Sequence, residues 1–190
     1  GNLNVLMTVT DNAGNATTTA DTTNATLDNH TPAAPAGLDL AAASDLGDSS
    51  TDNVTNDNTP TVAGTAQAAS TVTLFHSGTT SLGTATADSS GNWSITATTV
   101  SDGVQSFTAK STDAAGNVSP ASTALSVTVD TGKPTISDIA AQTIDEDANT
   151  GAVAFTIGDT LTAADSLVLT KASSNTTLLG TANIVLAGTG

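Results

Sequence analysis

The residues between Asp45 and Asn58 are the densest source of chemically active side chains in the sequence. They include four Asp and three Asn within 14 residues. Carboxylate and amide oxygens at such short spacing are ligands that hard cations such as Ca²⁺ take. The run lacks the Gly and Glu that an EF-hand requires at fixed positions, and it is not a glycine-rich β-helix repeat. Two interpretations stay open from this run alone, a calcium-binding loop and a solvated polar loop.

The composition limits the partners of the chain. The 190 residues carry 3 basic and 18 acidic side chains, for a formal net charge of −15, and 17 of the acids are Asp. This charge argues against nucleic acid and against anionic membrane surfaces. Asp is a poor helix former and favours turns and oxygen-ligand metal sites, so its excess over Glu indicates loops and strands. Thr, with 39 residues, supports strands as well.

Catalytic chemistry finds little support. The chain has no Cys, and its two His, His30 and His76, are predicted to be surface residues of a linker and a strand end. No Ser-His-Asp or two-His metal arrangement can be assembled from them. Paired Asp could suggest a glycosidase, but such a pair needs a cleft that short loops rarely form. We expect the chain not to be an enzyme.

Targeting signals are also missing from the sequence. No apolar run approaches the 18 residues that indicate a membrane-spanning helix, and residues 1–20 hold no signal-peptide core. A chain that is free of Cys and rich in Thr and Asp fits an extracellular protein without disulfides.

An internal repeat organises the chain. The motif at residues 10–15 (TDNAGN) recurs at 112–117 (TDAAGN), and Leu27-Asp28 with Pro32 recurs as Val129-Asp130 with Pro134. Both recurrences have the same spacing of 102 residues, from 10 to 112 and from 32 to 134. We predict the tail of one unit in residues 1–28, a complete unit in 29–132, and the start of another module in 133–190.

The complete unit has the pattern of an all-β sandwich, with short alternating runs separated by turn residues. We predict seven strands, at 36–43, 60–66, 70–76, 81–87, 92–98, 104–112 and 122–130. The predicted core is modest: Leu38, Leu40, Val62, Val72, Leu74, Trp93, Ile95, Phe107, Leu125 and Val127. Regular Thr-x-Thr faces can bind ice or sugars, but Thr71, Thr73, Thr84 and Thr86 are interpreted as solvent-facing strand residues.

A seven-stranded sandwich gathers aspartates at both of its ends. The loops after the first, third and fifth strands share the end that faces the next module. This brings together six residues: Asp45, Asp48, Asp52, Asp57, Asp102 and Asp130. The opposite end gathers Asp28, Asp88 and Asp113. Carboxylates collected in this way are costly without a cation, so all nine are candidate metal ligands.

Several motifs resemble bacterial immunoglobulin-like repeats. They are the run from Asn56 to Ala66 (NDNTPTVAGTA), Ser90–Ser94 (SGNWS), Thr112–Ser119 (TDAAGNVS) and the linker Val129–Pro134 (VDTGKP). Such repeats build the extender regions of giant RTX-type adhesins. Residues 135–190, with Ile144-Asp145-Glu146-Asp147 and Ser173–Leu178, resemble the opening of a cadherin-like repeat from the same proteins.

The resemblance implies a function and a cofactor. It implies tandem immunoglobulin-like sandwiches in a linear array, Ca²⁺ at the module junctions, and export by type I secretion to the bacterial surface for adhesion or biofilm formation. Neighbouring repeats would be the partners, without membrane insertion and with an unidentified adhesive target. The linkers depart from the family pattern, with Asn29-His30 and Gly132-Lys133 in place of small residues, and Lys133 could weaken or replace a cation.

Two other functions stay open. A carbohydrate-binding module would need an exposed aromatic side chain, with Trp93 as the first candidate. A self-assembling filament subunit would complete its sandwiches with strands from neighbouring copies.

Overall fold

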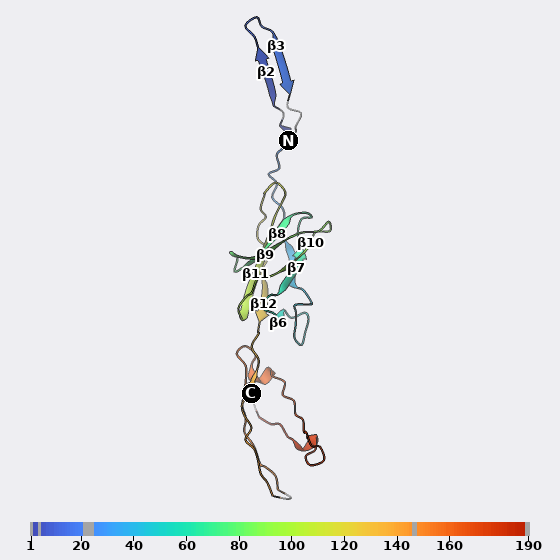
Figure 1. The fold of residues 1–190 in the computed structure, drawn as a ribbon, viewed down its shortest axis with the longest axis vertical. Coiled ribbons are helices and arrows are strands. Elements are labelled where there is room, and N and C mark those ends of the chain that lie inside the picture. The colour runs from blue at the N-terminus through green and yellow to red at the C-terminus, as the bar shows by residue number, and fades with distance from the viewer. Residues whose placement is uncertain (1, 4, 21–24, 146–147, 189–190) are drawn as a thin grey trace. The chain divides into compact units, whose positions relative to one another are not determined.

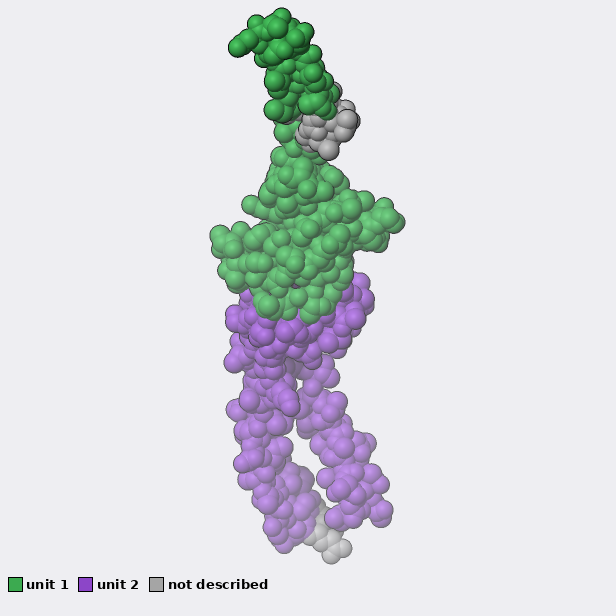
Figure 2. All heavy atoms as spheres, turned by 45° about the horizontal axis from the view of Figure 1, so that its top comes forward, with its two compact units in different colours: residues 1–39, 61–98, 106–125 green, residues 40–60, 99–105, 126–190 purple. Residues whose placement is uncertain are grey.

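The computed structural model describes residues 2–3, 5–20, 25–145 and 148–188 (Figure 1). The described residues form strands and loops without an α-helix, so the predicted all-β class is confirmed. The chain divides into two compact units, residues 1–39, 61–98 and 106–125, and residues 40–60, 99–105 and 126–190 (Figure 2). The predicted domain boundaries stay predictions.

Four short strands lie in residues 1–28. They are β1 (Asn2–Leu3), β2 (Leu6–Thr10), β3 (Ala16–Ala20) and β4 (Ala25–Thr26). β2 and β3 form an antiparallel hairpin, and β1 pairs with β4. Every side chain of β2 and β3 is exposed, including Leu6, Met7 and Val9, so the hairpin has no core of its own.

The first sheet of the central region has three strands. β7 (Thr61–Thr65) lies between β10 (Asn92–Thr96) and β5 (Ala36–Leu40). Burial alternates along β10, where Trp93 and Ile95 are buried and their neighbours are exposed. This period of two is that of a strand with one face in a core.

The second sheet has five strands in the order β6-β12-β11-β8-β9. Their bounds are β6 (Val54–Thr55), β8 (Thr71–His76), β9 (Thr80–Thr86), β11 (Gly103–Thr112) and β12 (Leu125–Val129). β6 and β12 pair in parallel, with Val54 opposite Thr128. The seven predicted strands all match observed strands. β6 was missed because two residues are too short to show alternation.

Buried apolar side chains come from both sheets, as in a sandwich. Eight of the ten predicted core residues are buried, with Phe107, Leu74, Val62 and Val127 fully so. Leu38 and Leu125 are only half-buried, so that part of the prediction is wrong; they lie in β5 and at the first residue of β12. The sequence analysis missed six further members: Leu82, Ala87, Ala97, Val100, Ala109 and Val129.

Three turns share one construction. In the turn Asp113–Asn117, Asp113 N–H donates to the Asn117 carbonyl at 3.1 Å, and Gly116 has φ +90°. The turns Asp11–Asn15 and Asp88–Asn92 repeat the same bonds, with Gly14 at φ +88° and Gly91 at φ +85°. Gly is needed there because other L-residues adopt a positive φ only at a cost. The repeated motif in the sequence is therefore a turn.

The segment after residue 132 has little regular structure. It contains β13 (Thr135–Ile136), β14 (Ile157–Gly158) and the 3₁₀ turns Ala164–Ser166 and Thr181–Asn183. The described residues of this segment include no fully buried side chain. Glu146 and Asp147, part of the predicted cadherin-like motif, lie outside the described residues.

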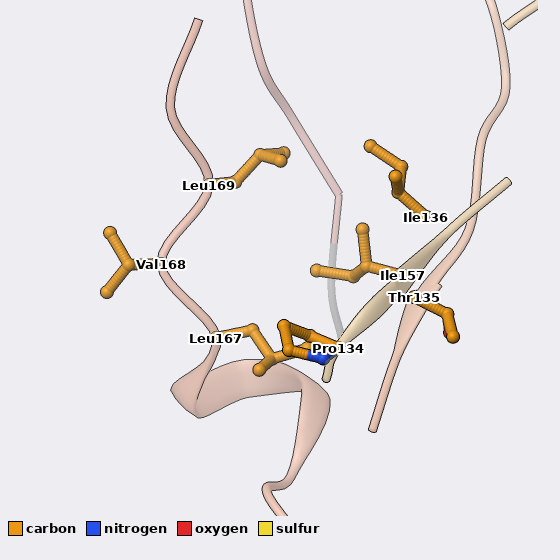
Figure 3. A pocket seen from close by; sticks show the side chains of 7 residues that line it. All are labelled: Pro134, Thr135, Ile136, Ile157, Leu167, Val168 and Leu169. Atoms are coloured by element: carbon orange, nitrogen blue, oxygen red, sulfur yellow. The ribbon is translucent and has the colours of Figure 1, made fainter. Parts of the chain in front are cut away.

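An apolar pocket of about 210 Å³ lies in this last segment. Leu169 points toward Ile136 and Ile157, while Val168 points away from them (Figure 3). The pocket is lined without any ionisable side chain. It therefore lacks groups for acid, base or metal chemistry.

Truncation of Phe107 to Ala tests the core. Phe107 is 0% exposed, so Phe107→Ala should lower the free energy of unfolding by about 3–5 kcal/mol. Val104→Ala is the control, because Val104 lies on the same strand and is 73% exposed. It should change stability by less than about 0.5 kcal/mol in the same urea titration. Equal effects of the two substitutions would show that the assigned face of β11 is wrong.

Two glycines of the same turn type should differ in their tolerance of Ala. A Cβ at Gly91 would lie 2.5 Å from the Ala66 carbonyl oxygen, whereas at Gly116 nothing lies within 4 Å. Gly116→Ala should therefore cost only the backbone strain, about 1–2 kcal/mol, and Gly91→Ala should cost more. Urea denaturation of both variants measures the difference. An equal loss of stability would contradict the described packing of the Asp88–Asn92 turn.

Candidate functional site

The linker that follows β12 has the most complete set of oxygen atoms among the predicted sites. Asp130 is half-buried, its Oδ1 accepts a hydrogen bond from Gly132 N–H at 3.1 Å, and its Oδ2 accepts one from the Thr162 hydroxyl at 3.4 Å. The backbone N–H of Asp130 donates to the Thr55 carbonyl at 2.8 Å. The carboxylate is thereby held beside residues that follow the linker.

Asp102 holds the next linker residue. The Thr131 hydroxyl lies 2.9 Å from Asp102 Oδ1 and 3.0 Å from Oδ2, and Thr131 N–H donates to Oδ1 at 3.2 Å. Asp102 and Asp130 are predicted to converge, and in the structure Asp102 bonds to Thr131, the residue next to Asp130. Whether they bind a metal stays a prediction.

Asp159 is a member of this cluster that the sequence analysis missed. It comes from the segment after the linker, and its Oδ2 lies 4.0 Å from the Cβ position of Gly132. The backbone N–H groups of Thr162 and Leu161 donate to it and lower its pKa below the ordinary value. The sequence carried no signal for it, because its contact with the linker is long-range.

Gly132 leaves a space lined by oxygen atoms. A Cβ there would lie 3.2 Å from Asp130 Oδ1 and 3.2 Å from Thr160 Oγ1. Two carboxylates and two hydroxyls of Thr160 and Thr162 suit a hard cation, whose remaining ligands are commonly carbonyls and water. Within the described ranges, however, no three His, Cys, Asp or Glu side chains gather closely enough to hold a metal ion. These oxygen atoms are therefore of the type that binds Ca²⁺, but they are too few to complete its coordination.

The other linker resembles the first in its local geometry. Asp28 Oδ1 accepts a hydrogen bond from His30 N–H at 3.0 Å, two residues on, as Asp130 does from Gly132. The Asp28 carbonyl accepts from Asn117 Nδ2 at 3.2 Å, which joins this linker to the Asp113 turn. The predicted proximity of Asp28 to that turn is therefore observed.

Asp113 and Asp88 serve their own turns. Asp113 Oδ1 accepts from Ala115 and Asn117 N–H at 2.9 Å each, and Oδ2 accepts from Asn117 Nδ2. Asp88 accepts from Ser90 and Asn92 in the same way. The Asn117 side chain holds the pKa of Asp113 below its ordinary value, and the Asn92 backbone N–H does the same for Asp88. These bonds give both residues a structural role that the prediction of metal binding did not include.

The four aspartates of the loop after β5 differ in their surroundings. Asp48 and Asp52 are exposed, and Asp52 Oδ1 accepts from Val54 N–H at 3.1 Å. Burial would raise the pKa of Asp57, but the donors from Thr59 and Ser44 lower it below the ordinary value. Asp45 is buried, at 4% exposure.

The two histidines show no catalytic arrangement. The ring of His76 lies against Phe107, with centroids 6.3 Å apart, and its Nε2 lies 3.2 Å from Ser77 Oγ. His30 is exposed in the linker. No helix of sufficient length and apolarity to cross a membrane occurs in the part of the chain that the structure describes.

Acidification should test the Asp113 turn. The Asp113 carboxylate accepts its full set of hydrogen bonds when it is ionised, and these bonds lower its pKa in the folded state. Their contribution to stability is therefore fully present at pH values above the ordinary Asp pKa of about 3.9. That stabilisation is lost as the pH falls through the folded-state value. The ¹³Cγ resonance of Asp113 should titrate below the ordinary Asp value of about 3.9. A midpoint equal to or above that value would contradict the described bonds.

Comparisons with known proteins were made for the whole chain. Residues 31–131 match the model of a bacterial Ig-like domain. A search of curated proteins finds no match.

Solved structures show weaker similarity. The BSP domain of a biofilm-associated protein is 20% identical, with a TM-score of 0.38, over 68% of this chain and 19% of that chain. A tetra-tandem repeat from the extending region of a large adhesion protein is 26% identical, with a TM-score of 0.34. A Ca²⁺-stabilised, ice-binding adhesin from an Antarctic bacterium is 28% identical, also with a TM-score of 0.34. Each of these last two matches covers 72% of this chain and 34% of the matched adhesin chain.

The family assignment therefore rests on the family model, which spans more than half of the residues and agrees with the two sheets and buried core described above. This chain belongs to the bacterial Ig-like domain family.

Proposed function

We propose that the chain is an extender segment of a large secreted bacterial adhesin, in which tandem β-sandwiches separate a binding domain from the cell. The observation that carries the proposal is the repeat of turn and linker at one spacing of 102 residues, from 10 to 112 and from 32 to 134. Between the two copies lies one bacterial Ig-like domain. A chain built by repetition of one module is suited to a spacer.

The linkers supply the mechanical part of the proposal. The carboxylates of Asp28 and Asp130 each accept a hydrogen bond from the backbone N–H two residues later, which restricts the linker before its Pro. Asp102 adds three contacts to Thr131. Because these groups belong to the linker and to loops next to it, they limit bending where one module ends.

Calcium is the proposed cofactor of the second linker. Asp130 and Asp159 would hold it, with the Thr160 and Thr162 hydroxyls and the Asp102 carboxylate nearby. A cation there would offset the repulsion between the carboxylates and draw the residues on both sides of Gly132 together. Extracellular modules bind Ca²⁺ at about 10⁻⁴–10⁻³ M, so the ion would bind after export. Type I secretion and biofilm adhesion belong to the same proposal.

A carbohydrate-binding function has less support. It would need an exposed aromatic side chain as a platform, and Trp93 is only 4% exposed. The apolar ring contributes instead to the core, where it lies close to Gly64. A catalytic role has no assembled site in its favour, and we propose a structural one.

Asp130→Asn tests the calcium proposal. Asn keeps the shape and a hydrogen-bond acceptor while removing the charge. At a free calcium concentration 100 times the dissociation constant, one site should stabilise the wild-type fold by about 2.7 kcal/mol. Thermal melting with calcium and with chelator measures this gain, which Asp130→Asn should greatly reduce.

Asp138→Asn is the matched control, because this substitution removes the same charge from an exposed residue outside the described cluster. It should keep the calcium response of the wild type. A wild-type melting temperature that is the same in calcium and in chelator would show that the linker carboxylates bind no stabilising ion. They would then act through hydrogen bonds alone.

A further inference from the structure

Asp102 is the one aspartate of the sequence that is followed by glycine. All other aspartates precede residues with a side chain, and no Asn precedes Gly. The carboxyl carbon of an Asp side chain can react with the backbone nitrogen of the next residue, which closes a five-membered succinimide ring. A Cβ on that next residue hinders the approach, and Gly has none. The sequence thus narrows this reaction to one peptide bond, between Asp102 and Gly103.

The structure leaves this peptide bond open. Asp102 is exposed, and Gly103, the first residue of β11, has φ +108°. Residues with a side chain rarely adopt such a φ, and a Cβ placed at Gly103 would have nothing within 4 Å. The ring can therefore close here without displacing packed neighbours.

Thr131 opposes this reaction. Its hydroxyl lies 2.9 Å from Asp102 Oδ1 and 3.0 Å from Oδ2, and its N–H donates to Oδ1 at 3.2 Å. Ring closure requires that one of these two oxygens leave as water. A carboxyl group that has both oxygens engaged by Thr131 must first give up those contacts. The reaction is therefore expected only while the contact between Asp102 and the linker is open.

We propose that Asp102–Gly103 is a site of spontaneous isomerisation to isoaspartate, and that Thr131 slows the reaction by holding the carboxylate. The Gly103 nitrogen attacks Asp102 Cγ and forms the new C–N bond, while the hydroxyl of the neutral carboxyl group leaves with the amide hydrogen as water. Water then opens the ring at one of its two carbonyl carbons. Opening at Cγ restores Asp102, whereas opening at the main-chain carbonyl carbon leaves Gly103 attached through Cγ, as isoaspartate. Nothing is oxidised or reduced, and the mass of the chain is unchanged.

The product weakens the hold on the linker. Isoaspartate lengthens the main chain by one carbon and shortens the side chain by one carbon, so its carboxylate no longer lies where Thr131 meets both oxygens. The contacts between Asp102 and Thr131 are then lost. This consequence needs neither a cation nor a particular role of the chain, and it goes beyond the extender function proposed above.

The test measures isoaspartate at residue 102 over time. The full chain is kept folded at neutral pH and body temperature for several weeks, in chelator so that calcium does not contribute. The same chain unfolded in guanidinium chloride is the reference. Endoproteinase Asp-N cleaves before Asp and not before isoaspartate, so mass spectrometry should find peptides that stay uncut between Ser101 and residue 102. The folded chain should accumulate them, and more slowly than the unfolded chain.

Thr131→Val tests the protecting contact. Val keeps the branched shape and removes the hydroxyl, and isomerisation should become about fivefold faster, the factor that one net hydrogen bond contributes. Thr99→Val is the matched control, because exposed Thr99 lies in the loop before Asp102 and is not part of this contact. It should keep the wild-type rate. In isomerised wild type, separated by ion exchange, the Thr131 N–H should exchange with deuterium faster than in the unmodified chain.

The other outcomes overturn the proposal. A folded wild type that forms no isoaspartate at residue 102 shows that the structure does not permit the reaction. Equal rates for Thr131→Val and Thr99→Val show that Thr131 does not protect Asp102. Unchanged exchange at the Thr131 N–H after isomerisation shows that the linker contact survives. The first and last measurements use the wild-type sequence, so they stand even where Thr131→Val fails to fold.

Discussion

The short side chain of aspartate, accepting hydrogen bonds from backbone N–H groups just ahead of it, is the interaction on which the structure depends. Asp11, Asp88 and Asp113 each accept from residues two and four positions on. Asp28 and Asp130 do the same two positions on, in the linkers. A longer Glu side chain does not favour these local bonds in the same way, which accounts for 17 Asp among 18 acids.

This interaction connects local turns to the larger organisation. The Asp11 turn joins the paired strands β2 and β3, and the Asp88 turn carries the chain from β9 in one sheet to β10 in the other. The same residue type then recurs where a module ends, so the same local hydrogen bonding serves both turns and linkers. Several of the carboxylates are thus each supplied with their own donors. Asp130 and Asp159 have donors as well, but both carboxylates lie beside Gly132, which is the reason for proposing a cation there.

Much of this could be predicted from the sequence, for identifiable reasons. The strands showed alternation bounded by turn residues, and all seven were found. Leu38 and Leu125 were assigned to the core because they share a face with Leu40 and Val127, but both are half-buried: Leu38 lies on the edge strand β5, and Leu125 is the first residue of β12. Asp88 and Asp113 lie between predicted strands, where turns were expected; only the hydrogen bonds that their carboxylates accept within those turns were not predicted. Asp159 and the burial of Asp45 depend on contacts between distant residues, which a single sequence does not reveal.

We propose that calcium at the linker carboxylates stiffens the connection between modules. Small-angle X-ray scattering of the full chain, with calcium and with chelator, measures this stiffening. We predict a larger maximum dimension and a narrower distance distribution in calcium, because bending at the linker is reduced. Identical distributions in both conditions would contradict it, and the linker would then be held by its hydrogen bonds alone.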